Sequence, residues 1–290
     1  MTLHNTTADF FVPDGATPAA ALARTTHLAI GAHQDDVEFM AVQGILECFG
    51  RADRAFGCAI CTNGAGSARV GPYAGVSDDA MCRLRRGEQR AAATIGRYAF
   101  VAQLDYTSAE TRTPGHPDLA ADLKAILQAV RPQVVYTHNL ADKHNTHVAV
   151  AVATLLAMRS LPRDQRPGRL FGCEVWRDLD WLNDDEKVVF DVSARQNLQA
   201  ALGGVYDSQI AGGKRYDLAS QGRRCAHATF LESHAADKSE MVALAMDLTP
   251  LVQDETLDPV EFALAAIRRF EDDVRQRLSP LLPAYKTVHR

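Results

Sequence analysis

The feature that most constrains the fold is a regular alternation of short apolar runs with longer segments of helical periodicity. In chain order the expected elements are strand 27–31, helix 37–49, strand 55–62, helix 79–95, strand 98–104, helix 117–130, strand 133–138 and helix 146–158. Strands that alternate with helices in this way form parallel βαβ units. The alternation therefore predicts an α/β fold with a doubly wound, mostly parallel sheet and helices on both faces.

Two of these helices indicate how the sheet is covered. The segment 117–130 begins with Pro117 and carries one apolar stripe, which is typical of a helix with a single buried face. In the segment 146–158, Val, Ala and Leu residues surround the whole helix, so we expect it to be buried. His147 lies in its first turn, and the sequence therefore places that imidazole inside the protein.

The chain beyond a Pro- and Arg-rich stretch at 161–169 is expected to form a C-terminal α/β extension packed on this core. Its expected elements are strand 170–176, strand 187–192, helix 194–203 and a less periodic region to about residue 240. We therefore divide the chain, within one structural domain, into an N-terminal arm at 1–25, a core at 26–160 and an extension at 161–290.

The last helix begins at Asp258-Pro259, where a capping residue is followed by a proline at the first helical position. An apolar stripe on this helix needs a partner surface, which in general is more often the core of the same chain than another subunit. The stripe consists of Val260, Leu264, Ile267, Phe270, Val274 and Leu278.

Composition and charge exclude several classes of function. The 290 residues are 47% hydrophobic, which is enough for a large globular core. The net charge is −5 and no Lys or Arg run is longer than a pair, so no nucleic-acid partner is expected. The first 25 residues contain neither a basic segment nor a continuous apolar one, so we expect no membrane span and a cytoplasmic protein.

Cysteine spacing indicates buried thiols in a reducing compartment. The six cysteines are scattered through apolar runs and do not form a disulfide framework. Cys58 and Cys61 have the spacing of some metal sites, but they lie in the expected strand 55–62. Side chains three apart on a strand point to opposite faces, so these two thiols cannot share a metal.

Acidic and imidazole side chains follow directly on the first expected strand. The segment 33–38 reads His-Gln-Asp-Asp-Val-Glu and lies at the carboxyl end of that strand, where α/β sheets bind their ligands. Adjacent Asp35 and Asp36 must project in different directions from a turn, so one carboxylate can bind an ion while the other faces water or substrate. His33 and Asp36, three apart on the same turn, can converge on one point.

A matching segment lies about a hundred residues later, at the same edge of the expected sheet. Residues 144–147 read His-Asn-Thr-His and start the helix that follows the fourth strand. His147 is the candidate third ligand beside His33 and Asp36, because catalytic zinc commonly has three protein ligands and an open position for water. Another divalent metal would also be compatible. His144 can lean toward the same pocket and stabilise an oxyanion or donate a proton.

Each segment alone has a simpler interpretation. An Asp-Asp pair at a helix start commonly caps the helix and compensates its dipole. A lone His-x-x-His pair at a helix start is more often structural. Both segments, however, fall on strand-to-helix junctions at one edge of one sheet, and this coincidence favours a metal site.

The same residues resemble a known family. Ala-His-Gln-Asp-Asp-Val-Glu at 32–38 resembles the Ala-His-Pro-Asp-Asp-x-Glu signature of the PIG-L/LmbE-like family of zinc-dependent N-acetylglucosaminyl deacetylases. Asp-Lys-His-Asn-Thr-His at 142–147 is similar to that family's Asp-x-His-x-Asp-His motif. Arg-Arg-Gly-Glu at 85–88, with Ile-Gly at 95–96, is similar to its Arg-x-x-Glu helix. The resemblance covers about residues 26–160.

The resemblance implies a Rossmann-like sheet and hydrolysis of an acetamide on an amino sugar or glycoconjugate. It also implies a role for each matching position. The implied roles are zinc ligands for His33, Asp36 and His147, general base for Asp35, oxyanion partner or acid for His144, and substrate contact for Arg85.

Two positions depart from the family pattern. Gln34 replaces the usual proline, which loosens a preset turn without removing a ligand. Thr146 replaces an aspartate that would hydrogen-bond a neighbouring histidine and raise its basicity. Asp142 and Asp105 are the candidates for the missing carboxylate, and the protonation state of His144 depends on which of them supplies it.

Two further features lie near the expected pocket. A Gly-rich loop at 63–75 follows the second strand and could close over the pocket or form a flexible surface loop. Trp176 and Trp181 could stack on a sugar, although a tryptophan in such an apolar run is more often part of the core.

The sequence therefore predicts a zinc-dependent N-deacetylase in which activated water attacks the amide and Asp35 is the general base. A metal-dependent amidase acting on a non-sugar N-acyl molecule stays open, as does a metal-binding but catalytically silent sugar-binding protein. A dinucleotide-dependent oxidoreductase is disfavoured because the first turn lacks Gly-x-Gly-x-x-Gly. The expected partner is a small amino-sugar or glycoconjugate substrate, and a homo-oligomer is not excluded.

Overall fold

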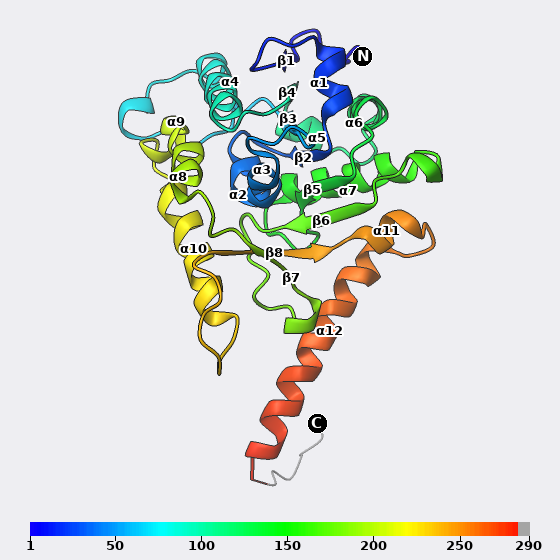
Figure 1. Cartoon of the computed structure of the whole chain (residues 1–290), viewed down its shortest axis with the longest axis vertical. Helices are drawn as coiled ribbons and strands as arrows, with labels where there is room; N and C mark the ends of the chain where they lie inside the picture. Colours follow the sequence, from blue (N-terminus) through cyan, green and yellow to red (C-terminus); the bar gives the residue numbers. More distant parts are fainter. Residues whose placement is uncertain (284–290) are drawn as a thin grey trace.

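The computed structural model describes residues 1–283 and shows an eight-stranded sheet with helices on both faces (Figure 1). The strands are β1 (Asp9–Phe11), β2 (His27–Gly31), β3 (Phe56–Thr62), β4 (Phe100–Tyr106), β5 (Val134–His138), β6 (Arg169–Cys173), β7 (Val188–Asp191) and β8 (Val242–Asp247). Their order across the sheet is β1-β4-β3-β2-β5-β6-β8-β7. The predicted α/β class with a mostly parallel, Rossmann-like sheet is confirmed.

The connectivity of the sheet creates a switch point between β2 and β5. The strands β4, β3, β2, β5 and β6 are parallel, and the chain moves outward from β2 in one direction before it crosses over to β5. Antiparallel β1 closes one edge, and antiparallel β8 and β7 extend the other. In doubly wound sheets the crevice at such a switch point, at the carboxyl ends of the strands, is where ligands bind.

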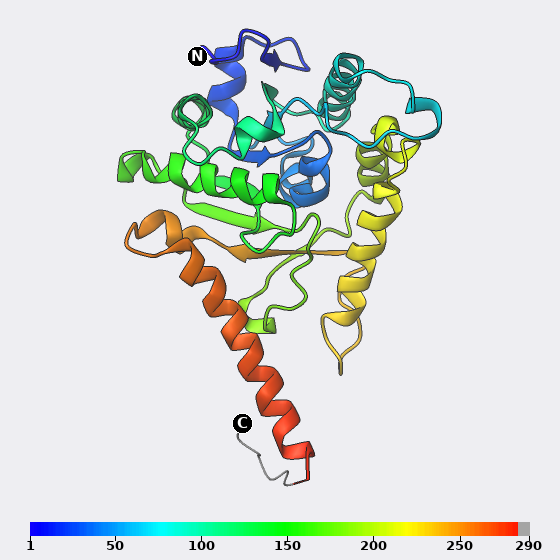
Figure 2. The ribbon, with the colours of Figure 1, turned by 180° about the vertical axis from the view of Figure 1, so that it is seen from behind.

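Helices cover both faces of this sheet (Figures 1 and 2). The helices are α1 (Pro18–Arg24), α2 (Asp36–Met40), α3 (Val42–Cys48), α4 (Asp78–Ile95), α5 (Ser108–Thr111), α6 (Pro117–Val130), α7 (Asn145–Arg159), α8 (Gln196–Gly204), α9 (Asp207–Ile210), α10 (Tyr216–Phe230), α11 (Thr249–Gln253) and α12 (Pro259–Leu278). Short 3₁₀ turns are η1 (Gly71–Tyr73), η2 (Arg163–Gln165), η3 (Asp184–Glu186) and η4 (Ser279–Leu281). Among the described helices, none has the length and apolar character needed to cross a membrane.

Two apolar clusters form the core, one on each face of the sheet. The first contains the stripe of α6, including Leu123 and Ile126, and packs against α7. The second contains residues of α3, α4 and α8, including Ile45. Cys61 belongs to the first cluster and Cys58 to the second, which confirms that these thiols point to opposite faces.

The eight elements expected before residue 160 are found within two residues at each end, with one exception. The expected helix 37–49 is divided into α2 and α3, because the backbone leaves the helical region at Ala41 (φ −110°, ψ 23°). The segment predicted as an N-terminal arm contains β1 and α1, and β1 pairs with β4. The division of the chain at 1–25, 26–160 and 161–290 stays a prediction.

The second half departs further from the expected elements. The expected strand 170–176 ends at Cys173, and the less periodic region before residue 240 contains the fifteen-residue helix α10. Arg224 and His227 are among its buried residues, so its buried face is partly polar and is not marked by an apolar stripe. Strand β8 was not expected either, and it inserts between β6 and β7.

The prediction that the stripe of α12 packs on the core of the same chain is wrong for most of its length. Ala266 is buried and Phe262 packs against the core, but the predicted stripe is exposed. Figures 1 and 2 show the helix extending away from the sheet, which leaves its distal turns without a neighbouring surface. The exposed stripe residues are Val260, Leu264, Ile267, Phe270, Val274 and Leu278.

Candidate metal centre

The candidate metal-binding side chains come from the two strand-to-helix junctions that flank the switch point. His33 lies in the turn after β2, and Asp36 is the first residue of α2. His147 lies in the first turn of α7, which follows β5. Because β2 and β5 are paired neighbours, their carboxyl ends bring these segments together although about 110 residues separate them in the sequence.

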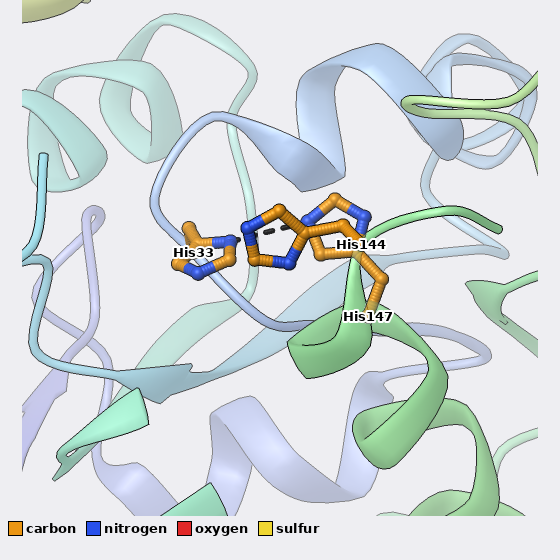
Figure 3. Close-up of side chains that lie close together, drawn as sticks. All are labelled: His33, His144 and His147. Carbon is orange, nitrogen blue, oxygen red and sulfur yellow. Dashed lines mark hydrogen bonds between the residues drawn. The ribbon is translucent and has the colours of Figure 1, made fainter. Parts of the chain in front are cut away.

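The geometry of the three side chains fits one metal ion. His33 Nδ1 lies 3.2 Å from His147 Nε2 (Figure 3). Asp36 Oδ2 lies 3.2 Å from His33 Nδ1 and 3.4 Å from His147 Nε2. Ligands at about 2.0–2.1 Å from a tetrahedral zinc ion lie about 3.3–3.4 Å from one another. The three atoms therefore have the spacing of one face of a tetrahedral site, with the fourth corner free for another ligand.

The charges around Asp36 and His147 favour the binding of a cation. Burial alone would raise the pKa of Asp36, but the imidazoles of His147, His138 and His33 hold it well below its ordinary value. The carboxylate is therefore ionised. Burial alone would lower the pKa of His147, but Asp36 and Asp142 raise it. Asp142 Oδ2 lies 3.5 Å from His147 Nδ1, on the side of the ring away from Asp36, and orients this ring as a carboxylate does behind many metal-binding histidines.

Asp35 occupies a different environment from its neighbour Asp36. Its φ of 91° is unusual for a residue other than glycine, and such backbone strain is concentrated at functional sites. Arg85 Nη2 lies 3.1 Å from Asp35 Oδ2 and also donates to the carbonyl of Gln34. Burial raises the pKa of Asp35 to about 6, although the Arg85 guanidinium opposes this rise. The two aspartates thus have separate electrostatic roles.

Arg85 was predicted to contact substrate, and the structure places it behind Asp35. Its side chain is only 2% exposed but lies in the wall of the cavity described below. Within residues 1–283 its buried Nε and Nη1 atoms have no hydrogen-bond partner. These two nitrogens carry N–H groups that a bound substrate can use. The contact of Arg85 with substrate therefore stays a prediction, whereas its pairing with Asp35 is observed.

His144 lies beside the candidate ligands, and one ring nitrogen from each of His33, His144 and His147 lies within 4.8 Å of the other two. Its ring meets His33 edge-on, with centroids 5.0 Å apart, and lies 4.5 Å from the ring of His147 (Figure 3). Burial lowers the pKa of His144 to about 4, with help from the neighbouring imidazoles. The ring is therefore neutral at physiological pH, and it can donate one N–H to a bound molecule.

The centre opens into a cavity of about 650 Å³. Gly64 and Ser67, from the loop after β3, form part of its wall, so the loop expected at 63–75 reaches the pocket. Gly64 has a φ of +77°, and a Cβ there would lie 2.6 Å from Gln34 Oε1, so this position requires glycine. Trp176 and Tyr216 also line the cavity, which makes Trp176 a pocket residue.

Comparison with known families and structures identifies the domain that carries this centre. Residues 28–158 match the family described as PIG-L, GlcNAc-PI de-N-acetylase. The match covers 131 of the 290 residues, which is less than half of the chain. The match runs from β2 to α7 and includes all six predicted site residues. For this segment, it confirms the predicted family and its N-deacetylase class of hydrolase. None of the curated proteins matches the chain.

Several solved structures share the fold of this protein. The 4-carboxy-2-hydroxymuconate hydratase of Pseudomonas putida KT2440 has a TM-score of 0.60 and 18% identity, covering 77% of this chain and 96% of that one. The N,N'-diacetylchitobiose deacetylase of Pyrococcus horikoshii has a TM-score of 0.62 and 13% identity, covering 83% and 90%. The zinc-inhibited form of a teicoplanin deacetylase has a TM-score of 0.54 and 18% identity, covering 77% and 98%. At these identities the likeness establishes the fold.

Thr146, which departs from the PIG-L pattern, is fully buried, and its hydroxyl accepts a hydrogen bond from Arg112 Nη1 at 3.3 Å. Neither candidate for the missing carboxylate reaches the His144 ring. Asp142 contacts His147, and the only group of His144 that it accepts a hydrogen bond from is the backbone N–H. Asp105 instead pairs with Arg86. His144 therefore has no carboxylate partner within residues 1–283, which agrees with its neutral state.

Gln34, the other departure from the PIG-L pattern, does not leave the turn loose. Its side chain is buried, and Nε2 donates to the carbonyl of Thr62 at 3.1 Å and to Gln103 Oε1 at 3.2 Å. These bonds tie the turn to β3 and β4. Side-chain hydrogen bonds thus supply the rigidity that a proline ring would otherwise provide.

His138 is a site residue that the sequence analysis missed. It ends β5, and its ring stacks on His147 with centroids 4.0 Å apart. His138 Nε2 lies 3.5 Å from Asp36 Oδ2 and accepts the backbone N–H of Ala32 at 2.9 Å, so its lone pair is already used. Burial keeps its pKa well below the ordinary value, and the ring is neutral. Its place at the carboxyl end of an expected strand was the only signal in the sequence.

Proposed function

We propose that this protein is a metal-dependent N-deacetylase that removes an acetyl group from an amino sugar or glycoconjugate. The observation that carries the proposal is the triangle of His33, Asp36 and His147 with the separately held Asp35 beside it. Of these four residues, His33, Asp35 and Asp36 line one cavity. A cation site next to an ionisable base is what amide hydrolysis by water requires.

The ligands in this proposal are His33, Asp36 and His147, and their two nitrogens and one oxygen suit zinc. A bound divalent ion would polarise the amide carbonyl and lower the pKa of a water molecule. The solved structure described as a zinc-inhibited teicoplanin deacetylase supports zinc binding within this fold. Which metal supports activity is a question for the assay below.

Asp35 is proposed as the general base and then the proton donor. With a pKa of about 6 it is largely ionised at neutral pH and can take a proton from the attacking water. Arg85 fixes one of its carboxylate oxygens. As the water oxygen bonds to the carbonyl carbon, Asp35 carries the proton that it later gives to the amide nitrogen. The C–N bond then breaks, and acetate and a free amine are released.

His144 is proposed to stabilise the oxyanion. Because its ring is neutral, it donates a hydrogen bond without adding a positive charge next to the cation site. This role does not need the carboxylate that an aspartate at position 146 would supply.

The choice of an amino sugar rests on the family match and on the pocket. The cavity volume of about 650 Å³ lies within the usual range for small-molecule sites. Trp176 and Tyr216 offer aromatic surface in its wall. A hydratase has the same fold, so the fold by itself does not specify amide hydrolysis. The alternatives that the test distinguishes are a non-sugar N-acyl substrate and a binding protein without catalytic activity.

The test measures release of acetate and amine from N-acetylated sugars and simple N-acyl amines, before and after metal removal with a chelator. We expect activity to disappear with the metal and to return when zinc or another divalent ion is added. Asp35→Asn should lower kcat about 100- to 10,000-fold, because the general base is lost. Asp105→Asn is the matched control, since that carboxylate pairs with Arg86 and does not line the cavity.

Each alternative predicts a different result from the same assay. Wild-type rates in Asp35→Asn would contradict the mechanism. Cleavage of simple N-acyl amines with no response to any amino sugar would replace the substrate class. Metal binding without any amide cleavage would identify a binding protein.

A further inference from the structure

The last helix, α12, exposes an apolar stripe to solvent. In the described part of the chain the six stripe residues are 38% to 64% exposed. Leu281 and Leu282, just beyond the helix, continue the apolar surface and are 80% and 51% exposed. Figures 1 and 2 show α12 extending away from the sheet, although a helix in a protein is stabilised mainly by packing of its apolar face. A continuous apolar surface of this kind marks a site of association.

The spacing of the stripe is that of a coiled-coil seam. Along α12 the seam positions follow one another at alternating intervals of four and three residues, and one of them, Glu271, is not apolar. The apolar seam positions are Val260, Leu264, Ile267, Val274 and Leu278. Side chains with this spacing enter holes between the side chains of a facing helix. The surface that covers the seam is therefore expected to be another helix.

A second copy of α12 matches this seam in the antiparallel direction. In an alignment centred on residue 269, Val260 lies opposite Leu278 of the second copy, and Leu264 lies opposite Val274 of the second copy. Phe270, beside the seam, comes next to Phe270 of the second copy at the two-fold axis, where the two rings can pack together. The same surface on two copies is thus complementary to itself.

The charges along the seam also favour the antiparallel direction. Glu261 comes level with Arg275 of the second copy to within two residues, on the same side of the seam. Arg268 comes level with Glu271 of the second copy to within one residue, and two-fold symmetry makes each contact twice. In the parallel direction Glu271 would instead face Glu271 of the second copy, and these like charges would repel each other.

We propose that α12 pairs with α12 of a second copy of this chain as an antiparallel, two-fold coiled coil. Pairing would remove the stripes of both copies from water and give each projecting helix a packing surface. The helix lies outside the matched segment 28–158, and none of its residues lines the cavity at the candidate metal centre. The proposal is therefore independent of the proposed function.

The oligomeric state of the full chain tests the pairing. Size-exclusion chromatography with light scattering should give twice the mass of one chain, and sedimentation velocity over a dilution series gives the Kd of the dimer. In Leu264→Gln/Val274→Gln this Kd should rise at least about 100-fold, because apolar contacts are lost on both copies. Both positions are exposed in a single copy, so the variant should keep its fold, which circular dichroism checks.

The matched control is Asp272→Ala/Gln276→Ala. These two residues are exposed on α12 and lie outside the seam, so the control should keep the wild-type Kd.

Cysteine cross-linking tests the direction of the pairing. Leu264→Cys/Val274→Cys should give a disulfide-linked dimer under mild oxidation, because each new thiol faces the other kind in the second copy. Within one chain the two positions are about 15 Å apart along the helix, too far for an internal disulfide. Neither single variant should cross-link more than the wild type, which controls for Cys82 and Cys225, the two native cysteines that are not buried.

Three results would overturn the proposal. A wild type that is monomeric at every concentration would show that α12 does not pair with a second copy. A dimer with an unchanged Kd in Leu264→Gln/Val274→Gln would place the interface elsewhere. Cross-linking through Val274→Cys alone would show that the two helices are parallel.

Discussion

At the scale of single residues, three aspartates in one site have different properties because their neighbours differ. Asp36 faces three imidazoles, which favour its charged form. Asp35 is buried beside a single guanidinium, and burial raises its pKa. Asp142 stands behind His147 and also accepts two backbone N–H groups, from His144 and Trp176. The residue type therefore does not determine the role, and the surroundings do.

Asp142→Asn tests the contribution of the carboxylate behind His147. The amide oxygen can still accept the backbone hydrogen bonds, but the negative charge that raises the pKa of His147 is lost. We expect metal affinity to fall about 10- to 100-fold, as when similar carboxylates are removed behind other metal ligands. Competition with a chromogenic chelator measures this affinity. Asp105→Asn should keep the wild-type affinity, and an equal loss in both variants would contradict the role of Asp142.

Some of these residue relations follow from sequence and others do not. The convergence of His33, Asp36 and His147 is predictable, because each lies at a strand-to-helix junction of one sheet edge. The partner of Asp142 is not, because it depends on the rotation of His147 about α7. His138 was missed since a histidine at a strand end can point to either face.

At the scale of secondary-structure elements, close packing of α3 on the sheet keeps the first helical layer near β5. Gly44 in α3 faces the ring of Tyr136, and a Cβ at this position would lie 2.5 Å from Tyr136 Cε2. Gly87 in α4 is exposed, and a Cβ there would meet no atom within 4 Å. Close packing therefore requires glycine at position 44, whereas no steric contact requires it at position 87.

Gly44→Ala and Gly87→Ala form a matched pair. Gly44→Ala should lower the free energy of unfolding by about 1–3 kcal/mol, because the added methyl overpacks the interface with Tyr136. Gly87→Ala should raise it by about 0.5–1 kcal/mol, because alanine favours the helix at an exposed position. Urea unfolding of the metal-free protein measures both changes. A stabilising Gly44→Ala would show that α3 can move away from the sheet without cost.

Helix α10 was not predicted, because its buried face is partly polar. In α10, Arg224 is buried and donates to the carbonyls of Glu38 and Phe39 and to Gln199. These bonds hold α10 against α2 and α8, and they place a charged side chain on the buried face of the helix. For α12 the sequence predicted a buried stripe that the structure shows exposed. Apolar periodicity predicts a helix, but it does not predict whether another surface covers the apolar side.

At the scale of the whole molecule, Glu38 joins distant parts of the chain. Its buried carboxylate accepts hydrogen bonds from Tyr98, Gln89 and Tyr206 at 2.8, 3.0 and 2.6 Å. Tyr206 belongs to the C-terminal extension, so this group links α2 to that extension. Burial raises the pKa of Glu38 to about 7, although these three donors oppose the rise.

The raised pKa of Glu38 makes the stability of the whole protein depend on pH. Between about pH 4.5 and 7 the folded state holds a proton on Glu38 that the unfolded state has released, so stability falls as pH rises. The shift corresponds to about 3 kcal/mol across this window. Glu38→Gln should remove this contribution. Urea unfolding at pH 5 and pH 7.5, with a chelator present, measures it, and an identical pH dependence in variant and wild type would contradict the assignment.

The sequence by itself determined the alternation of strands and helices, the parallel sheet and the edge at which His33, Asp36 and His147 meet. These features follow from local periodicity and from the rule that parallel strands share a carboxyl edge. Only the tertiary structure decided the partner of Asp142, the placement of Arg85 behind Asp35, the position of His138 beside His147 and the burial of α10. Each of these depends on the orientation of side chains, which is set by packing in the folded chain and not by local periodicity.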